Sequence, residues 1–468
     1  MLVLCVWCAL CLLSVLGIFN ASVKDFPIVQ VCHFSGIALF MFTMFYAMEN
    51  IPSAEKWISY AILASVLFLL AAGIQQYFWG FKESLEYVQK QEELSGAKLP
   101  DGLRNRLEQT RLFTTFSLCN SYAAHLILVA PFCIFLISTS ASTVKFAFTF
   151  ILTCLIYFIF PYANQIMFFL ITVFYSLSVV LLYRKFPEKL MPYFRAFCIV
   201  VVSLSFLFNL YFTGSRAAVL AFGTACGVIA SSVLYAKFAC TRKVIVVLAL
   251  VALVTIAIYV PIVSGRDLGS MYVRLDYYRV ALKLFFKNPL IGSGWGDFFH
   301  EYTRWKNFPG TEAPHTPHNF LLSFASQTGF LGFIAALAVI LIPLAIFLWK
   351  TLIKKEVDIR NSAIMTGYLA WCLHGLLDIN IQIAGTVATA TTLLMMIKLD
   401  MPIAKKSLEE KIISRPAFTF LWYQFMLIFL IFGIFIAGYR LRAEAYYQKL
   451  HDLCEAKFMS PEDFAKIP

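Results

Sequence analysis

Residues 319–349 read "NFLLSFASQTGFLGFIAALAVILIPLAIFLW" and contain no charged side chain. A helix crosses the hydrocarbon core of a bilayer with about 20 apolar residues. This run is longer than one upright span requires, so we expect it to tilt, to kink at Pro343 or to protrude. The stretch therefore predicts a membrane-spanning helix.

The rest of the chain repeats this pattern. Hydrophobic residues make up 60% of the sequence, charged residues 14%, and the mean hydropathy is +0.78. The apolar runs are continuous rather than alternating, which excludes a membrane β-barrel. The sequence predicts an all-α fold, a polytopic bundle of about 12–13 transmembrane helices. The other runs are 2–19, 28–47, 57–77, 121–138, 145–160, 163–183, 194–213, 217–235, 244–262, 362–378, 380–397 and 417–437.

The net charge of +12 has a topological explanation. Much of the excess lies in short loops between the predicted spans, where Lys and Arg orient helices. No basic stripe interleaves with aromatic residues, so we expect no nucleic-acid partner. The twelve cysteines are scattered, mostly within apolar runs, and predict neither a zinc site nor a disulfide framework.

The basic loops predict the orientation and the domain layout. Residues 184–195, 237–243, 350–360 and 398–415 are rich in Lys and Arg and fall on one side, which the positive-inside rule makes cytoplasmic. Two long polar segments then face outward. We expect one transmembrane domain at residues 1–438, with outward loops at 78–120 and 263–317. A helical tail at residues 439–468 is also expected to lie outside.

Arginines at the predicted outer face form the first candidate anion site. Arg216 follows Gly214 and Ser215 at the end of a span, within "FNLYFTGSRAAVLAFG" (208–223). An arginine near hydrocarbon is a candidate functional residue, and its fork of donors suits phosphate oxygens. An interface anchor or a structural ion pair explains the same position.

The main outward loop contains a second basic element. Residues 274–287, "RLDYYRVALKLFFK", have helical spacing and place Arg274 and Arg279 on neighbouring faces. "NPLIGSGWGDF" then ends the helix with three glycines. This helix either rests on the membrane surface or carries two arginines to an anionic headgroup. Its apolar face is predicted to hold Leu275, Tyr278, Leu282 and Phe285.

The third candidate element is "PHTPHN" (314–319), which precedes the opening stretch. His318 has the chemistry of a general base near neutral pH, and Asn319 of a group that orients a polar partner. A structural histidine at the interface is the alternative. Arg111 precedes one span, and Asp378 lies in an outward turn, where it either holds an arginine or His318 or caps the turn.

Taken in order, these elements resemble the O-antigen ligase and O-antigen polymerase superfamily. The matching stretches are "TGSRAA", "YYRVALKLFFKNPLIGSGWGDF", and "HN" followed by nine residues and "GFLG". "RLFTTFSLCNSYAAHLILVAP" (111–131) resembles the family's arginine, phenylalanine and asparagine entry into a span. The resemblance covers roughly residues 104–340, and the histidine–asparagine–glycine spacing is closest to the ligases.

The resemblance implies a bacterial glycosyltransferase that uses no metal and no other cofactor. Such enzymes move a glycan from an undecaprenyl-diphosphate carrier to a lipid, glycan or protein acceptor at the periplasmic face of the inner membrane. By this resemblance His318 is the general base, Arg216 binds the diphosphate, and Arg274 is the loop arginine, with Arg279 as the alternative. Asn319, Arg111 and Asp378 are supporting residues.

Other functions remain open at the level of sequence. A repeat-unit polymerase shares the donor chemistry and differs in the acceptor. A transporter or flippase for an anionic lipid would carry charges near the bilayer midplane and inverted repeats, and neither is visible here. A structural membrane protein leaves the ordered motifs to chance. Two departures from the ligases are a thirteenth apolar run and Tyr278 at a position that is often Trp.

Overall fold

The chain divides into two units, residues 1–399 and 400–468. The computed structural model describes residues in the first unit only, and every element within them is a helix. The predicted runs 163–183 and 417–437, nearly all of 244–262, and the predicted tail lie outside the described residues. The residues that the structure describes are 2–23, 25–95, 108–159, 188–238, 246, 269–307 and 314–397.

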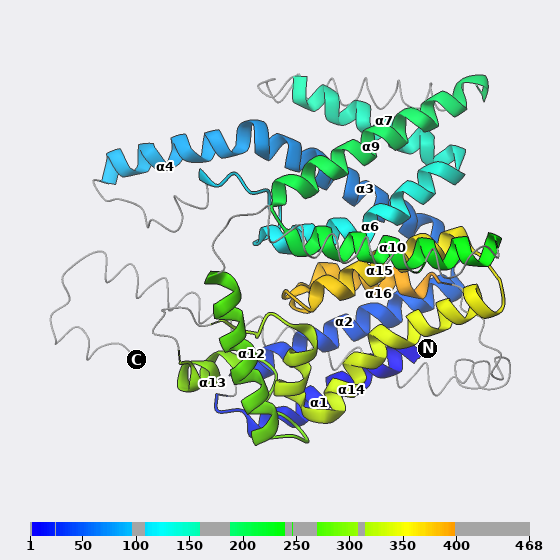
Figure 1. Cartoon of the computed structure of the whole chain (residues 1–468). Helices are drawn as coiled ribbons and strands as arrows, with labels where there is room; N and C mark the ends of the chain where they lie inside the picture. Colours follow the sequence, from blue (N-terminus) through cyan, green and yellow to red (C-terminus); the bar gives the residue numbers. More distant parts are fainter. Residues whose placement is uncertain are drawn as a thin grey trace. The chain divides into compact units, whose positions relative to one another are not determined.

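Most of the described helices follow the predicted apolar runs, and three lie within the predicted outward loops 78–120 and 263–317 (Figure 1). They are α1 (Leu2–Gly17), α2 (Asp25–Asn50), α3 (Ala54–Gln75), α4 (Phe81–Ser95), α6 (Cys119–Thr139), α7 (Ala141–Ile159), α9 (Met191–Thr213), α10 (Arg216–Phe238), α12 (Gly269–Lys287), α13 (Phe298–Trp305), α14 (Phe320–Leu348), α15 (Ile359–Gly375) and α16 (Ala384–Met395).

The predicted class, a polytopic helical membrane protein, is confirmed. Six of the described helical stretches are long and apolar enough to cross a bilayer. Shorter apolar helices accompany them at Leu10–Asn20, Ala141–Thr153 and Ala384–Met395. The six stretches are Pro27–Asn50, Ala54–Leu94, Cys119–Thr139, Glu188–Thr213, Arg216–Lys237 and Phe320–Ile353.

Helix α6 lies at the centre of the described unit. It packs against α3, α9 and α15, and α10 and α16 in turn contact α15. Gly367 makes the close approach of α15 possible, because a Cβ there would collide with the Leu128 carbonyl of α6. Small residues at such crossings let backbones approach in a membrane, where lipid supplies no hydrophobic drive between helices.

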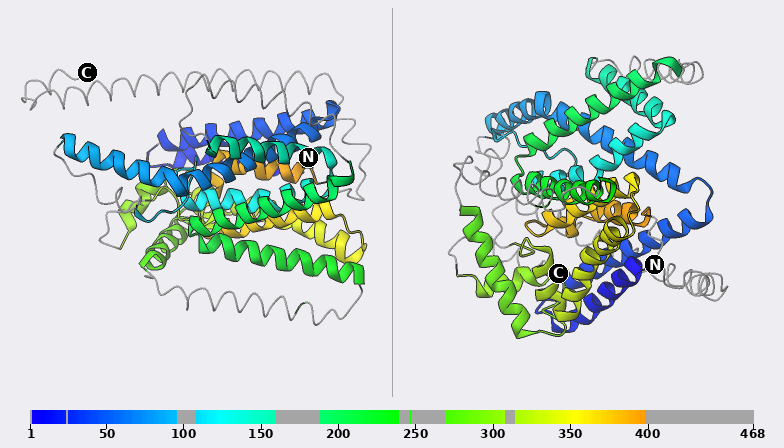
Figure 2. Two further views of the ribbon diagram at one scale, coloured as in Figure 1. Left: turned by 90° about the horizontal axis from the view of Figure 1, so that it is seen from above. Right: turned by 45° about the vertical axis from the view of Figure 1, so that its right-hand side comes forward.

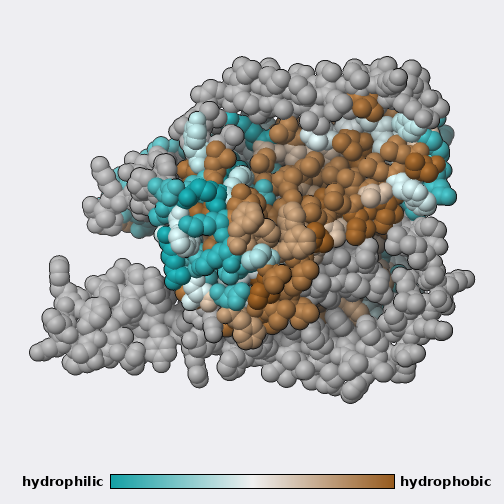
Figure 3. All heavy atoms as spheres, turned by 60° about the horizontal axis from the view of Figure 1, so that its bottom comes forward, coloured by the Kyte–Doolittle hydropathy of each residue, from teal (hydrophilic) through white to brown (hydrophobic). Residues whose placement is uncertain are grey.

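One end of the helices carries the polar elements. Helix α4 continues α3 through a π-turn at Gln76–Gly80, so the predicted outward loop 78–120 begins as a helix. In both further views α4 lies at the same end as α12 and α13 (Figure 2). The space-filling view shows an apolar surface over the described helices and a polar surface at this end (Figure 3). We refer to the end of the described helices that carries α4, α12 and α13 as the polar end.

The long run from residue 319 is broken at Gly329, not at Pro343. Gly329 has φ 72° and ψ −164°, a conformation essentially restricted to glycine, whereas Pro343 lies within regular helix. The loop 288–296 packs into this break. Phe330 N donates to Pro289 O at 2.7 Å, and Ser293 N donates to Ser326 O at 2.9 Å. The break therefore gives the loop backbone partners on α14.

Replacing Gly329 with alanine is expected to destabilise the fold by about 3 kcal/mol or more. The new Cβ would meet the Leu290 carbonyl and the φ would be strained. Thermal unfolding of purified protein in detergent measures the change. Gly36→Ala is the matched control, since nothing lies within 4 Å of a Cβ there. Equal midpoints for the two variants would contradict this account of the break.

Helix α12 packs through a different face from the predicted one. Its buried side chains face α13 and α14, whereas Leu275 and Leu282 of the expected apolar stripe are exposed. An aromatic contact with α13 stabilises the observed face, because the rings of Tyr277 and Tyr302 pack edge to face with centroids 5.2 Å apart. The buried set is Tyr277, Val280, Ala281 and Leu284.

Glu301 fixes α13 to the segment between α1 and α2. Its side chain is 4% exposed and accepts hydrogen bonds from Ser22 Oγ at 2.7 Å and Trp305 Nε1 at 3.0 Å. Arg304 Nη1 lies 3.0 Å from Oε1. Burial raises the pKa of Glu301, but these hydrogen bonds and nearby cations outweigh it and leave the pKa below its ordinary value of 4.5.

This shift predicts an acid-sensitive contact. Because the folded pKa lies below the unfolded value, the ionised Glu301 contributes stability above about pH 4.5, and that stability is lost as pH falls through the folded pKa. Glu301→Gln is therefore expected to lower stability at pH 7 and to flatten its decline as pH falls from about 5 to below 4.5. Thermal midpoints across this range measure the effect. A parallel decline in both proteins would contradict it.

Candidate functional site

His318 lies at the polar end, directly before α14. It adopts a left-handed backbone with φ 54°, which turns the chain into the helix. Its ring stacks on Tyr277 with centroids 5.8 Å apart and planes 24° apart, and its Nδ1 lies 3.9 Å from Asp378 Oδ1. The ring is thus held on one side by an aromatic face and approached at Nδ1 by a carboxylate.

Asp378 is buried at the turn that follows α15 and is held by two donors. Its Oδ2 accepts from Asn120 Nδ2 at 2.6 Å, and its Oδ1 accepts from the backbone N–H of Ile379 at 2.7 Å. A buried carboxylate with such partners is fixed in direction. Asp378 therefore presents Oδ1 to His318 from a rigid position.

Arg111 continues this chain of contacts on its other side. Its Nη2 donates to Asn120 Oδ1 at 3.3 Å, and its Nε donates to Thr213 O at 2.9 Å. Thr213 ends α9, and Gly214 beyond it has φ 64° and lies against the guanidinium. Arg111 thus connects the Asp378 carboxylate with the turn that leads to Arg216.

Arg274 reaches from α12 to the same turn as Asp378. Its Nη1 donates to the Leu377 carbonyl at 2.7 Å, and a guanidinium carries five N–H donors in all. The neighbouring Tyr278 has a pKa above its ordinary value of 10, because burial raises it by more than Arg274 and a hydrogen bond with Asn319 lower it. Tyr278 is therefore a neutral phenol close to the guanidinium.

Asn319 acts as the N-cap of α14. Its Oδ1 accepts from the Leu322 N–H at 2.9 Å, and its Nδ2 donates to the Leu376 carbonyl at 2.8 Å. One side chain thus satisfies the helix start and fastens it to the end of α15. This geometry explains why asparagine follows the histidine.

Arg279 is directed elsewhere. Its Nε lies 3.1 Å from Asp276 Oδ1 and its Nη2 donates to the Trp305 carbonyl at 2.7 Å. Tyr302 donates to the other oxygen of Asp276 at 3.0 Å, so these residues join α12 to α13. Of the two loop arginines, only Arg274 contacts the turn that holds Asp378.

Arg216 begins α10 and is exposed at the polar end. Ser215 before it is buried, with its Oγ 3.4 Å from His374 Nε2, and His374 Nδ1 lies 2.9 Å from Asn380 Oδ1. The start of α10 is therefore linked to the residues around Asp378 through a buried histidine.

The structure brings together most of the residues that the sequence singled out. Arg111, Arg274, His318, Asn319 and Asp378 form one contact network, and Arg216 adjoins it through Ser215. Sequence reasoning missed further members of this network. They are Tyr277 and His374, each a single residue three or four positions from a recognised one. Asn120 also belongs to the network and is the asparagine of the span-entry motif at residues 111–131.

Comparison with known proteins gives one family match. Residues 198–337 match the family model described as O-antigen ligase. The resemblance to the O-antigen ligase superfamily is thereby confirmed. No curated protein matches the chain significantly. The matched segment includes Arg216, Arg274 and His318, whereas Arg111 and Asp378 lie outside it.

The match sets the general character of the protein. Together with the six apolar helices, the similarity over residues 198–337 indicates an integral membrane protein, and the members of the matched family are membrane enzymes that act on glycans. Among the described residues, no group of three or more His, Cys, Asp and Glu side chains is arranged to hold a metal ion.

Proposed function

We propose that this protein is an O-antigen ligase-like glycosyltransferase. It moves a glycan from an undecaprenyl-diphosphate carrier to a hydroxyl acceptor at the periplasmic face of the inner membrane. The observation that supports this most is the pairing of His318 with Asp378 beside Arg274, within and next to the segment that matches the ligase family. One base, its orienting carboxylate and a cation are the groups that such a transfer requires.

His318 acts as the general base in this proposal. The Asp378 carboxylate near Nδ1 favours the tautomer with the proton on Nδ1, so Nε2 carries the lone pair. An acceptor hydroxyl is a poor nucleophile, and Nε2 takes its proton as the oxygen attacks the anomeric carbon. A bond forms between this carbon and the acceptor oxygen, and the bond to the diphosphate oxygen breaks.

Arg274 and Arg216 stabilise the leaving diphosphate. The leaving group departs with negative charge, and fixed guanidinium donors stabilise it without reorganisation. Arg274 is fixed at one nitrogen by Leu377 O and retains donors for the phosphate oxygens. Arg216 lies at the N-terminus of α10, where the helix dipole also favours an anion. The lipid carrier reaches this end of the helices from within the bilayer.

Ligase and polymerase activities predict different intermediates in a cell that lacks the protein. Loss of a ligase leaves intact long glycan chains on the carrier lipid, because polymerisation precedes transfer. Loss of a polymerase leaves single repeat units. We expect long chains, at least tenfold above the parent strain, in mass spectra of extracted lipid-linked glycans. Accumulation of single repeats would assign the polymerase reaction instead.

A further inference from the structure

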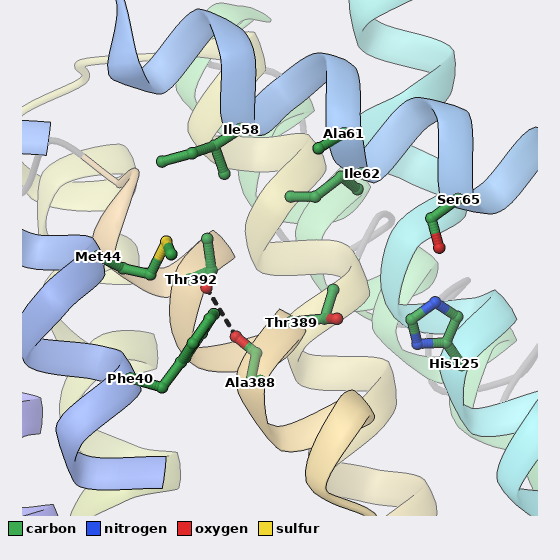
Figure 4. Close-up of a pocket in the computed structure, with 10 residues that line it drawn as sticks. All are labelled: Phe40, Met44, Ile58, Ala61, Ile62, Ser65, His125, Ala388, Thr389 and Thr392. Carbon is green, nitrogen blue, oxygen red and sulfur yellow. Dashed lines mark hydrogen bonds between the residues drawn. The ribbon is translucent and has the colours of Figure 1, made fainter. Parts of the chain in front are cut away.

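A cavity of about 250 Å³ lies between α2, α3, α6 and α16, and none of its lining residues belongs to the candidate site (Figure 4). Phe40 and Met44 lie at one end, and Ser65 and His125 at the other. Most of the remaining lining is aliphatic, contributed by α3 and α16. An apolar cavity of about 150 Å³ admits a benzene ring, so this one has room for a segment of hydrocarbon chain.

The surroundings of the cavity make that hydrocarbon a lipid. Helices α2, α3 and α6 all belong to candidate membrane-spanning stretches. Ala61 and Ser65 on α3 line the cavity and are exposed, so the cavity opens towards the surroundings of the helices. In a bilayer these surroundings are acyl chains at this depth.

His125 gives the cavity one unmet polar requirement. It is 7% exposed, and its Nδ1 has no hydrogen-bond partner among the residues that the structure describes. The hydroxyls of Thr389 and Thr392 are satisfied by the carbonyls of Gly385 and Ala388. A buried polar atom without a partner costs about 1–3 kcal/mol, and a polar side chain within a membrane span usually has a function.

We propose that this cavity binds an acyl lipid, with one hydrocarbon chain along α2, α3 and α16 and an ester carbonyl or hydroxyl hydrogen-bonded to His125. His125 lies about 9 Å along α6 from the start of this helix at the polar end. A plain isoprenoid hydrocarbon fills the apolar part but offers His125 no partner. The proposal is independent of the glycosyl-transfer chemistry above.

Photolabelling in vesicles tests the site. Wild-type protein is reconstituted in phosphatidylethanolamine and phosphatidylglycerol vesicles that contain a phosphatidylethanolamine with a diazirine midway along one acyl chain. Peptide mass spectrometry is expected to find label concentrated on the cavity lining, at Phe40, Met44, Ala61 and Thr389. A diazirine-bearing isoprenoid hydrocarbon at equal concentration is expected to label these residues several-fold less. Equal labelling by both probes would overturn the assignment to an acyl lipid.

Variants separate the hydrogen bond from the space. His125→Phe is expected to lower the acyl label roughly two- to tenfold, which corresponds to one net hydrogen bond. His125→Gln keeps a donor and an acceptor and is expected to stay within about twofold of wild type. Unchanged labelling in His125→Phe would overturn the role of the imidazole.

Filling the cavity keeps the test independent of His125. Ala61→Phe occupies the space from an exposed position and is expected to abolish the lining label. Val219→Phe on α10 adds the same ring at another exposed position outside the cavity and is expected to change nothing. Label spread evenly over exposed positions of all helices, or a lining label that survives Ala61→Phe, would overturn the proposal.

Discussion

Replacing His318 with alanine is expected to lower the rate of glycan transfer by a factor of about 10²–10⁴, the range typical for a general base. The change removes the nitrogen that takes the acceptor proton and leaves the N-cap at Asn319 intact. The measurement is transfer in vitro from a polyprenyl-diphosphate-linked glycan to an acceptor, with purified protein. A second variant, Asp378→Asn, is expected to retain more activity, since it keeps the base and loses its orientation.

His315→Ala is the matched control for this prediction. His315 precedes His318 by three residues, is exposed, and stacks on Phe299 with centroids 5.0 Å apart rather than on Tyr277. Its loss is expected to leave transfer within about threefold of wild type. Thermal midpoints of both variants report whether the fold survives. Full activity of a folded His318→Ala protein would exclude the proposed base.

Replacing Arg274 with alanine is expected to raise the barrier of the transfer step by about 3–4 kcal/mol, a loss of roughly 10²–10³ in rate. The guanidinium lies beside the residues that hold His318 and is the loop cation best placed to stabilise the departing diphosphate. Arg274→Lys is expected to recover only part of the rate, because an ammonium group cannot donate as a planar fork. Rates under single-turnover conditions measure the chemical step.

Arg279 on the same helix provides the contrast. Its described contacts join α12 to α13, so Arg279→Ala is expected to lower stability by about 1 kcal/mol and to leave the transfer rate of folded protein unchanged. The two variants are therefore distinguished by two assays: Arg274→Ala slows transfer, whereas Arg279→Ala lowers stability. The reverse pattern, with slow transfer in Arg279→Ala and normal transfer in Arg274→Ala, would assign the diphosphate to the other arginine.

Much of the candidate site was predicted from local sequence. Arg111, Arg274 and Arg279 lie in the predicted outward loops, whereas Arg216, His318, Asn319 and Asp378 are polar side chains at the ends of apolar runs. Such a position is unusual enough to identify without coordinates, because a polar group near hydrocarbon needs a partner or a function. His374, which was missed, lies inside the predicted span 362–378, where a polar residue is commonly a satisfied member of the core.

The sequence by itself determined the class of the protein. Backbone groups in a bilayer must be paired within the protein, and continuous rather than alternating apolar runs exclude a barrel, so each long run is expected to become a helix. The pattern is local, and the described helices follow it. The residue types of the site were also recognised from local sequence, because most of them stand in short motifs that follow one another along the chain.

Only the tertiary structure decided which of these groups meet. Arg274 and Arg279 share one helix, and the choice between them followed from how α12 packs, with Tyr277 rather than Leu275 turned inward. The break in α14 lies at Gly329, where the loop 288–296 forms backbone hydrogen bonds with the helix. The sequence had pointed to Pro343 as the place of a kink. Contacts between segments far apart in the chain depend on packing and backbone hydrogen bonds, which the spacing of residues within one segment does not encode.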